Sequence, residues 1–218
     1  MTGTNQLFEE IGSPLLFRNI PDFDIEELIQ LLGPRIVQTS GKDYAIAMHK
    51  ENPSDYSDRT EYFDWHSDGL YHVVRKPPQF VLLHCLNKGT QDIKTELTDT
   101  ATILNKLSFQ NIQILGKLQS IYIGHNGSFT HPILNTLGML LASRGYISPL
   151  SEISIESQPS IRNITETLTE LYYLLDMHAV PYIWNIGDTL IFDQYRYMHR
   201  RNSASIDRNR KLIRMWFN

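Results

Sequence analysis

Two histidines and one aspartate in this 218-residue sequence have the types and the order that a single-metal site requires. His66 and Asp68 are two residues apart in the segment FDWHSDG. In an extended chain, residues i and i+2 point to the same side, so this imidazole and this carboxylate can converge on one ion. A third candidate ligand, His199, follows the segment IFDQYRYM. Two histidines and one carboxylate leave coordination positions open, an arrangement that suits an Fe(II) ion that must bind both dioxygen and an organic ligand.

The H-x-D triplet alone is weak evidence for a metal, because a chain with eight histidines can contain it by chance. The remaining histidines have no comparable partner in the sequence. We interpret them as surface, core or loop residues: His49, His72, His84, His125, His131 and His178.

Two arginines follow His199 at distances of eleven and fifteen residues, in the segment RKLIRMWF. If this segment is a strand, Arg210, Leu212 and Arg214 share one face, and the two arginines are separated by about 13 Å. An arginine side chain binds a carboxylate through two parallel hydrogen bonds. The segment therefore predicts an anion site near the metal, whereas the same segment without a nearby metal ligand would be interpreted as a basic, solvated edge strand.

Short strands and a few helices must position these residues. Apolar runs predict strands at 15–20, 79–86, 120–124, 182–192 (with a turn at 185–188) and 211–217. Helical spacing predicts helices at 23–32, 98–107 and 161–177, the second of them capped by Thr98 or Asp99. This α+β pattern indicates a closed or sandwiched sheet, and periodicity alone does not distinguish a jelly roll from another sandwich.

The ordered motifs from Trp65 to the C-terminus resemble those of the Fe(II)/2-oxoglutarate-dependent dioxygenases of the taurine dioxygenase (TauD/TfdA-like) type. The motifs are W-H-S-D, P-P-Q-F-V-L-L-H-C-L with K-T-E-L-T-D-T, T-H-P-I-L, W-N-I-G-D-T-L-I-F-D-Q-Y-R-Y-M-H and R-K-L-I-R. The resemblance implies a double-stranded β-helix (jelly-roll, cupin-like) core with flanking helices, in a single oxygenase domain over residues 1–218. One position departs from the family pattern, because Gln194 stands where an Asn is usual.

The resemblance also implies roles for individual residues. By position in the motifs, His66, Asp68 and His199 would ligate Fe(II). Arg210 would bind the far carboxylate of the co-substrate 2-oxoglutarate, with the hydroxyl group of Thr95 beside it. The other co-substrate implied is O2.

The substrate side is expected to involve Arg214, Tyr62 and Tyr71. Arg214 would contact the co-substrate or an acidic group of the substrate, and the two tyrosines would form part of the wall. Related halogenases lack the carboxylate found here as Asp68, so hydroxylation, desaturation or cyclisation is expected, with release of succinate and CO2. The expected substrate is a small polar molecule, an amino acid or a natural-product intermediate.

Composition excludes several other classes of protein. The formal net charge of −4 and the pI of about 6.0 argue against a binder of nucleic-acid phosphates. The single cysteine, Cys85, excludes an intrachain disulfide and a Cys-rich zinc site. No apolar run approaches the ~20 residues of a membrane span, and the first residues lack signal-peptide features. We expect a cytoplasmic protein with no nucleic-acid or membrane partner, for which an oligomer is possible but not indicated.

Two alternatives use the same residues differently. A zinc hydrolase with the same three ligands would act without oxygen or keto acid, but it leaves Arg210 without a task and has no evident general base. A sandwich that binds a ligand without catalysis would tolerate loss of Asp68 without loss of function.

Overall fold

The computed structural model describes most of the chain, with gaps between the described ranges. These are residues 13–21, 25–38, 41–48, 63–69, 77–90, 92–124, 127–135, 138–141, 146–151, 153–154, 157–201 and 209–218. Tyr62 and Tyr71 lie outside the described residues, so the prediction that they face the substrate stays a prediction.

The described elements alternate short strands with a few helices. In chain order they are β1 (Leu15–Phe17), α2 (Ile25–Leu32), β2 (Tyr44–Met48), β3 (Phe63–His66), β4 (Phe80–Asn87), β5 (Thr95–Asp99), α3 (Thr100–Leu104), α4 (Phe109–Leu115), β6 (Leu118–Gly124), β7 (Gly127–Pro132), β8 (Tyr146–Pro149), α5 (Ile161–Met177), β9 (Val180–Tyr182), β10 (Thr189–Asp193), β11 (Tyr197–Arg201) and β12 (Lys211–Phe217).

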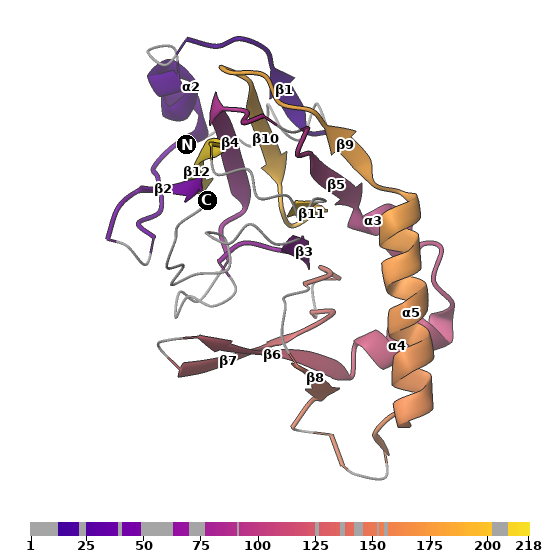
Figure 1. Ribbon diagram of the computed structural model, residues 1–218. Helices are drawn as coiled ribbons and strands as arrows, with labels where there is room; N and C mark the ends of the chain where they lie inside the picture. Colours follow the sequence, from indigo (N-terminus) through magenta and orange to yellow (C-terminus); the bar gives the residue numbers. More distant parts are fainter. Residues whose placement is uncertain are drawn as a thin grey trace.

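Two antiparallel sheets form the body of the molecule (Figure 1). The larger sheet has the strand order β1-β10-β4-β12-β2, and the smaller has the order β3-β11-β5-β9. Buried residues of β4, β10 and β12 from the larger sheet form one core cluster with Leu97 of β5 and Tyr197 of β11. The two sheets therefore pack face to face, and the fold is the expected jelly-roll type of α+β structure.

Strand β4 is buried on both faces, which explains its nearly continuous apolar sequence. Val81, Leu83 and Cys85 belong to the core between the two sheets. The alternate residues Phe80 and Leu82 pack in a second cluster that includes residues of helix α2. The sheet is thus covered on its outer face by the N-terminal helix.

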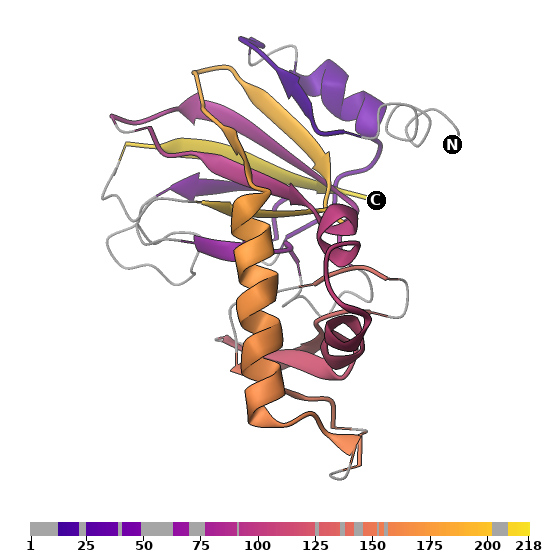
Figure 2. The same ribbon diagram turned by 90° about the vertical axis from the view of Figure 1, so that its right-hand side faces the viewer.

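Helix α5 runs from the smaller sheet to a separate three-stranded sheet, β7-β6-β8 (Figures 1 and 2). Its bounds are those that the sequence predicts, and the Ser160 hydroxyl caps it by accepting a hydrogen bond from the amide of Asn163. Leu171 and Leu175 of this helix share a core cluster with Trp65 of β3 and Met198 of β11. The helix therefore packs against the outer face of the strands that carry both candidate histidine ligands.

The predicted helix at 98–107 starts two residues later than expected. Thr98 and Asp99 instead end strand β5, because they pair with Met198 and Tyr197 of β11. The Asp99 carboxylate then caps helix α3 by accepting a hydrogen bond from the amide of Ala101. One of the two predicted caps is thus confirmed, and pairing between strands has overridden the local helical spacing.

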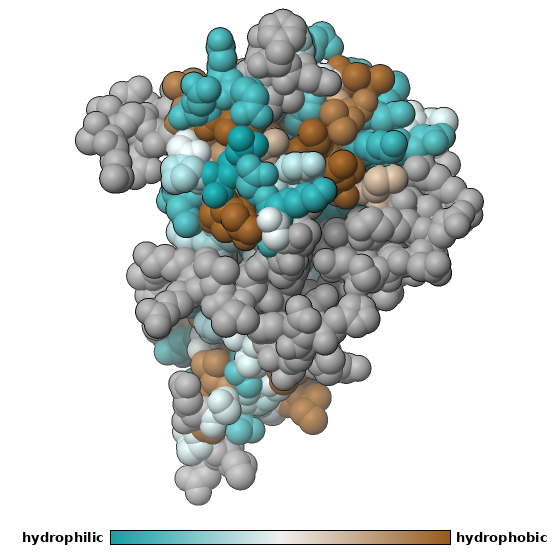
Figure 3. Space-filling view, turned by 90° about the vertical axis from the view of Figure 1, so that its left-hand side faces the viewer, coloured by the Kyte–Doolittle hydropathy of each residue, from teal (hydrophilic) through white to brown (hydrophobic). Residues whose placement is uncertain are grey.

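The face that carries α2 and β2 is mainly hydrophilic on the upper body, with hydrophobic residues interspersed (Figure 3). Exposed hydrophobic side chains of the described residues in this region include Leu31, Val37 and Ile46. None of the described helices combines the length and the apolar character that crossing a membrane requires.

Candidate metal centre

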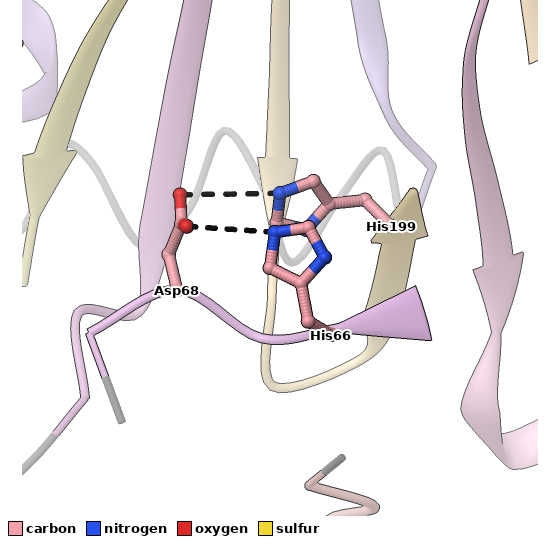
Figure 4. A group of neighbouring side chains, drawn as sticks. All are labelled: His66, Asp68 and His199. Atoms are coloured by element: carbon pink, nitrogen blue, oxygen red, sulfur yellow. Dashed lines mark ion pairs between the residues drawn. The ribbon is translucent and has the colours of Figure 1, made fainter. Parts of the chain in front are cut away.

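Three side chains, two from neighbouring strands and one from the turn that follows one of them, converge in the core of the sandwich (Figure 4). His66 ends β3, His199 lies in β11, and the two are direct cross-strand partners. Asp68 follows β3 after one intervening residue, and its oxygens lie 3.8 Å from Nε2 of His66 and 3.9 Å from Nε2 of His199. The candidate ligand atoms all lie within 4.8 Å of one another, and all three residues are buried.

A tight turn after β3 brings the carboxylate back toward the histidines. Gly69 closes this turn with a φ angle of +78°, which side chains other than hydrogen rarely allow. A Cβ atom at this position would also lie 2.6 Å from Cδ of Pro78. The sequence H-S-D-G thus positions Asp68 partly because only glycine fits at its end.

The Asp68 carboxylate is held on both oxygens. Nη1 of Arg214 donates to Oδ1 at 2.9 Å, and Nε1 of Trp216 donates to Oδ2 at 3.1 Å. Nη2 of Arg214 also donates to Oε1 of Gln38 at 3.2 Å. The strand that was predicted to supply an anion site therefore also orients a candidate metal ligand.

The side chain of Gln194 holds the main chain of Asp68. Oε1 of Gln194 accepts a hydrogen bond of 2.8 Å from the Asp68 amide, and Nε2 of Gln194 donates to the Asp68 carbonyl at 3.2 Å and to the carbonyl of Pro78. Gln194 is buried, so these bonds replace contacts with water. Gln194, which departs from the family pattern, thus fixes the main chain at Asp68.

The ring of His66 is oriented by a hydrogen bond of 2.7 Å between its Nδ1 and the carbonyl oxygen of Asp64. A carbonyl oxygen only accepts, so Nδ1 carries the hydrogen and Nε2 is the nitrogen able to coordinate a metal. Nε2 faces Asp68 across the centre of the group. Two imidazole nitrogens and one carboxylate on one side of a small space fit a mononuclear Fe(II) centre with open positions.

Burial and charge keep all three groups in the form that a metal needs. Desolvation, the neighbouring His199 and Arg214 hold the pKa of His66 well below 6.5, and desolvation also lowers the pKa of His199. Burial alone would raise the pKa of Asp68, but Arg214 and the two histidines outweigh it and lower the pKa to about 2. At neutral pH the imidazoles are therefore uncharged and the carboxylate is ionised.

A cavity of about 450 Å³, including the open space at its mouth, adjoins the two histidines. Arg210, Leu212 and Arg214 all line it, which confirms the predicted face of β12. Thr95 also lines the cavity, and its hydroxyl oxygen accepts a hydrogen bond of 3.0 Å from Nε1 of Trp184. The remaining lining residues are Ala47, His66, Leu83, His199, Arg200 and Arg201.

Several residues that shape the site were not singled out for this role by the sequence. In the sequence, Gln194 stands out only as a departure from the family pattern, and no motif marks Trp216 or Gln38. Among the tyrosines expected near the substrate, Tyr62 and Tyr71 lie outside the described ranges. The structure brings together His66, Asp68, His199 and Arg214, with Thr95 and Arg210 in the wall of the adjoining cavity.

Residues 5–216 of the chain match the family described as "Taurine catabolism dioxygenase TauD, TfdA family". A curated relative, 3-((Z)-2-isocyanoethenyl)-1H-indole synthase of Fischerella ambigua (strain UTEX 1903), is 25% identical over 240 residues, which covers 99% of this chain and 83% of the relative.

Two solved structures have similar folds. PvcB, an Fe, alpha-ketoglutarate dependent oxygenase from an isonitrile synthetic pathway, aligns with a TM-score of 0.70 and 15% identity over 98% of this chain and 78% of its own. An asparagine oxygenase in complex with Fe(II), 2S,3S-3-hydroxyasparagine and succinate aligns with a TM-score of 0.63 and 18% identity over 81% of this chain and 57% of its own.

Proposed function

Since this chain belongs to the TauD, TfdA family, it is an Fe(II)/2-oxoglutarate-dependent dioxygenase, and we propose that it oxidises a small molecule derived from an amino acid. The observation that carries the proposal is the buried group of His66, Asp68 and His199 beside a cavity lined by arginines. Residues 5–216 match one family, which supports a single oxygenase domain.

His66, Asp68 and His199 are the proposed iron ligands. The support is their mutual distances, the orientation of the His66 ring by Asp64, and the charge states that burial and Arg214 impose. When bound, Fe(II) and 2-oxoglutarate together supply the activation of O2 that oxidises a C–H bond, with succinate and CO2 as the other products. The part of the protein is to hold the ligands on one side and leave the other side accessible from the cavity.

Arg210 and Thr95 are the proposed site for the far carboxylate of 2-oxoglutarate. Both line the cavity, and both are buried, so a guanidinium–carboxylate pair there would be strengthened by the exclusion of water. The hydrogen bond that Trp184 donates to Thr95 fixes the hydroxyl oxygen as an acceptor on that side. The hydroxyl hydrogen can then be donated to a carboxylate oxygen.

Arg214 is proposed to orient Asp68 and to face an anionic group in the cavity, because it bonds Asp68 and Gln38 and also lines that cavity. Tyr62 and Tyr71 remain proposed wall residues on the substrate side.

The substrate proposal draws on the relatives. The curated relative makes an isocyanoethenyl indole, and the solved structures include an oxygenase of an isonitrile pathway and an asparagine oxygenase. An amino acid or an amino-acid derivative bearing an isonitrile group is therefore the first class to test. Hydroxylation, desaturation and cyclisation are the candidate outcomes, because Asp68 supplies the carboxylate ligand that the halogenase type lacks.

The decisive experiment combines a binding signal with turnover. Anaerobic Fe(II) and 2-oxoglutarate should give a weak visible charge-transfer band, and the band should be absent in His199→Ala. Amino acids, their acyl derivatives and their isonitrile derivatives are then screened for succinate formation that depends on O2 and on the added compound. The proposal is wrong if folded wild-type protein gives no band and no compound stimulates succinate formation.

The hydrolase alternative is less well supported. Among the described residues lining the cavity there is no carboxylate that could act as a general base, and the lining contains four arginines: Arg200, Arg201, Arg210 and Arg214. A hydrolase would also act without O2 or 2-oxoglutarate, so omission of either one from the assay separates the two activities.

A further inference from the structure

A second cluster of charged and aromatic side chains lies on the opposite face of the strands that carry the candidate ligands. It consists of Trp65 on β3, Glu96 on β5, Arg200 on β11 and Asp176 in the last turn of α5. We call these four residues the Arg200 cluster. Trp65 and Arg200 are the sequence neighbours of His66 and His199, and alternation along a strand directs neighbours to opposite faces. Arg200 also borders the cavity, but its guanidinium contacts the other members of the cluster.

Arg200 contacts every other member of the cluster. Its Nε donates to Oε2 of Glu96 at 2.6 Å, and its Nη1 donates to Oδ1 of Asp176. The carbon at the centre of its guanidinium lies 4.4 Å from the centroid of the Trp65 ring, a stacking distance. Nε1 of Trp65 closes the network by donating to the same oxygen of Asp176 at 2.9 Å.

The Arg200 cluster connects β3 to β11 and α5 where the main-chain pairing of β3 is limited. Among the described strands, β3 is hydrogen-bonded only to β11, and the register between them shifts between His199 and Arg201. Strand β3 is four residues long. A short edge strand with an irregular register has few main-chain bonds to hold it, so side-chain contacts must fix its position.

The position of Asp176 is unfavourable for the helix alone. A carboxylate in the last turn of a helix faces the negative end of the helix dipole, and α5 has no basic residue in that turn. The Asp176 side chain is still half exposed, whereas those of Arg200 and Glu96 are almost completely buried, at 12% and 9% exposure. The Arg200–Glu96 pair is therefore the desolvated core of the cluster, and Asp176 links it to Trp65.

We infer that Arg200 is a positioning residue for the metal centre. By stacking on Trp65 and bonding Glu96 and Asp176, it holds β3 against β11 and α5, and so fixes the separation of His66 and His199 on the other face. The inference rests on the proposed function in one respect, namely that these two histidines are metal ligands. Arginine is required because its plane can stack and donate in two directions at once, which a lysine ammonium cannot do.

The test measures metal affinity separately from stability. Arg200→Met, Arg200→Lys and a control, Arg162→Met, are titrated anaerobically with Fe(II), with and without 2-oxoglutarate, at a temperature where each is folded. The control removes a solvent-exposed arginine that pairs with Glu166 on the same helix α5 that carries Asp176. We expect Arg200→Met to weaken Fe(II) binding about tenfold, the lower end of the loss seen when an outer partner of a ligand is removed, and to shift the visible band.

Arg162→Met and Arg200→Lys serve as controls for this experiment. Arg162→Met should leave both signals unchanged, and Arg200→Lys should weaken binding by nearly as much as Arg200→Met. If Arg200→Met lowers only the melting temperature and leaves the dissociation constant and the band unchanged, the inference is wrong. If Arg200→Met does not fold, Trp65→Phe and Asp176→Ala decide instead. Trp65→Phe removes the hydrogen bond from Trp65 to Asp176, Asp176→Ala removes both bonds to Asp176, and each leaves the Arg200–Glu96 pair in place. Unchanged Fe(II) affinity in both variants overturns the inference.

A cycle of single and double variants tests whether the residues act as one unit. Trp65→Phe and Arg200→Met should be less than additive in their effect on Fe(II) affinity. His199→Ala distinguishes a failure of the proposed ligand set from a failure of the proposed role of Arg200. If it binds Fe(II) as tightly as the wild type, the proposed ligand set fails; if it does not bind while Arg200→Met binds normally, only the role of Arg200 fails.

Discussion

Arg214 and Asp68 form a buried ion pair in which Nη1 lies 2.9 Å from Oδ1. The arginine lies in strand β12 of the larger sheet, and the aspartate follows strand β3, an edge strand of the smaller sheet. The pair therefore spans the two sheets at the candidate metal centre. A positive charge at this point favours the ionised carboxylate and disfavours protonated histidines, which are the charge states that metal binding requires.

Removal of Arg214 should be strongly destabilising. Arg214→Met leaves the buried Asp68 carboxylate without its charged partner, and losses of this kind cost about 3–5 kcal/mol. Urea unfolding of the metal-free protein measures the change. The exposed pair of Arg162 and Glu166 provides the comparison, because Arg162→Met removes only a solvent-screened ion pair and should cost far less than Arg214→Met. Equal costs for the two variants would contradict the importance of the buried pair.

The metal-free protein should lose stability as the pH falls below about 6.5. The pKa values of His66 and His199 are lowered in the folded state, so the unfolded chain binds more protons below the ordinary histidine value. The stability contribution is thus complete above pH 6.5 and is lost in acid. Unfolding free energies between pH 8 and pH 5, compared with His66→Asn/His199→Asn, isolate the effect. A curve parallel to that of the double variant would refute it.

A second loss of stability belongs to Asp68 at lower pH. Its pKa is lowered from 3.8 to about 2, so folding favours the ionised form above pH 4 and this advantage disappears as the pH falls toward 2. The contribution is about 2 kcal/mol at neutral pH. Trp216→Phe removes one donor to the carboxylate and should shift the acid-unfolding midpoint to higher pH. An unchanged midpoint would count against the hydrogen bond from Trp216.

Gln194→Ala should weaken both metal binding and the fold. The variant removes the hydrogen bonds of Gln194 to the Asp68 amide, the Asp68 carbonyl and the Pro78 carbonyl. The main chain that carries the Asp68 carboxylate is then no longer held in place. We expect about tenfold weaker Fe(II) binding and a loss of roughly 1–3 kcal/mol in unfolding free energy. Anaerobic titration and urea unfolding give the two values. Wild-type affinity in a folded Gln194→Ala protein would show that these bonds do not position Asp68.

Thr95→Val should raise the KM for 2-oxoglutarate with little change in kcat. One hydrogen bond to a charged carboxylate is worth about 1.5 kcal/mol, which corresponds to roughly tenfold in affinity. Thr98→Val is the matched control, since its hydroxyl lies on the same strand but donates to the carbonyl of Leu175. Thr98→Val should leave the KM unchanged. An unchanged KM in Thr95→Val would remove Thr95 from the proposed co-substrate site.

Much of the fold and the centre of the site could be predicted from local pattern. The sequence correctly paired His66 with Asp68, although Asp68 lies in the turn after β3 and not in an extended strand. Period 2 correctly grouped Arg210, Leu212 and Arg214 on the cavity face. This second prediction succeeds because alternation along a strand is a local property. Helix 161–177 was predicted with correct bounds for the same reason, since its apolar spacing lies within the segment.

The contacts that depend on pairing between distant strands were not predictable. Gln194 and Asp68 are 126 residues apart, and Arg214 and Asp68 are 146 apart, so no spacing rule connects them. Thr98 and Asp99 were assigned to a helix by local spacing and belong to a strand because β11 pairs with them. Local propensity is a weak prior that tertiary context overrides.

The direct pairing of His66 with His199 ties the assembly of the centre to the correct alignment of two strands. If β3 slipped by a single residue, Trp65 would turn inward and His66 would point toward helix α5, so the ion would lose a ligand. A metal that binds only the correctly aligned chain stabilises that alignment over its neighbours. Iron bound at the proposed site would therefore favour the chains in which β3 is correctly aligned with β11.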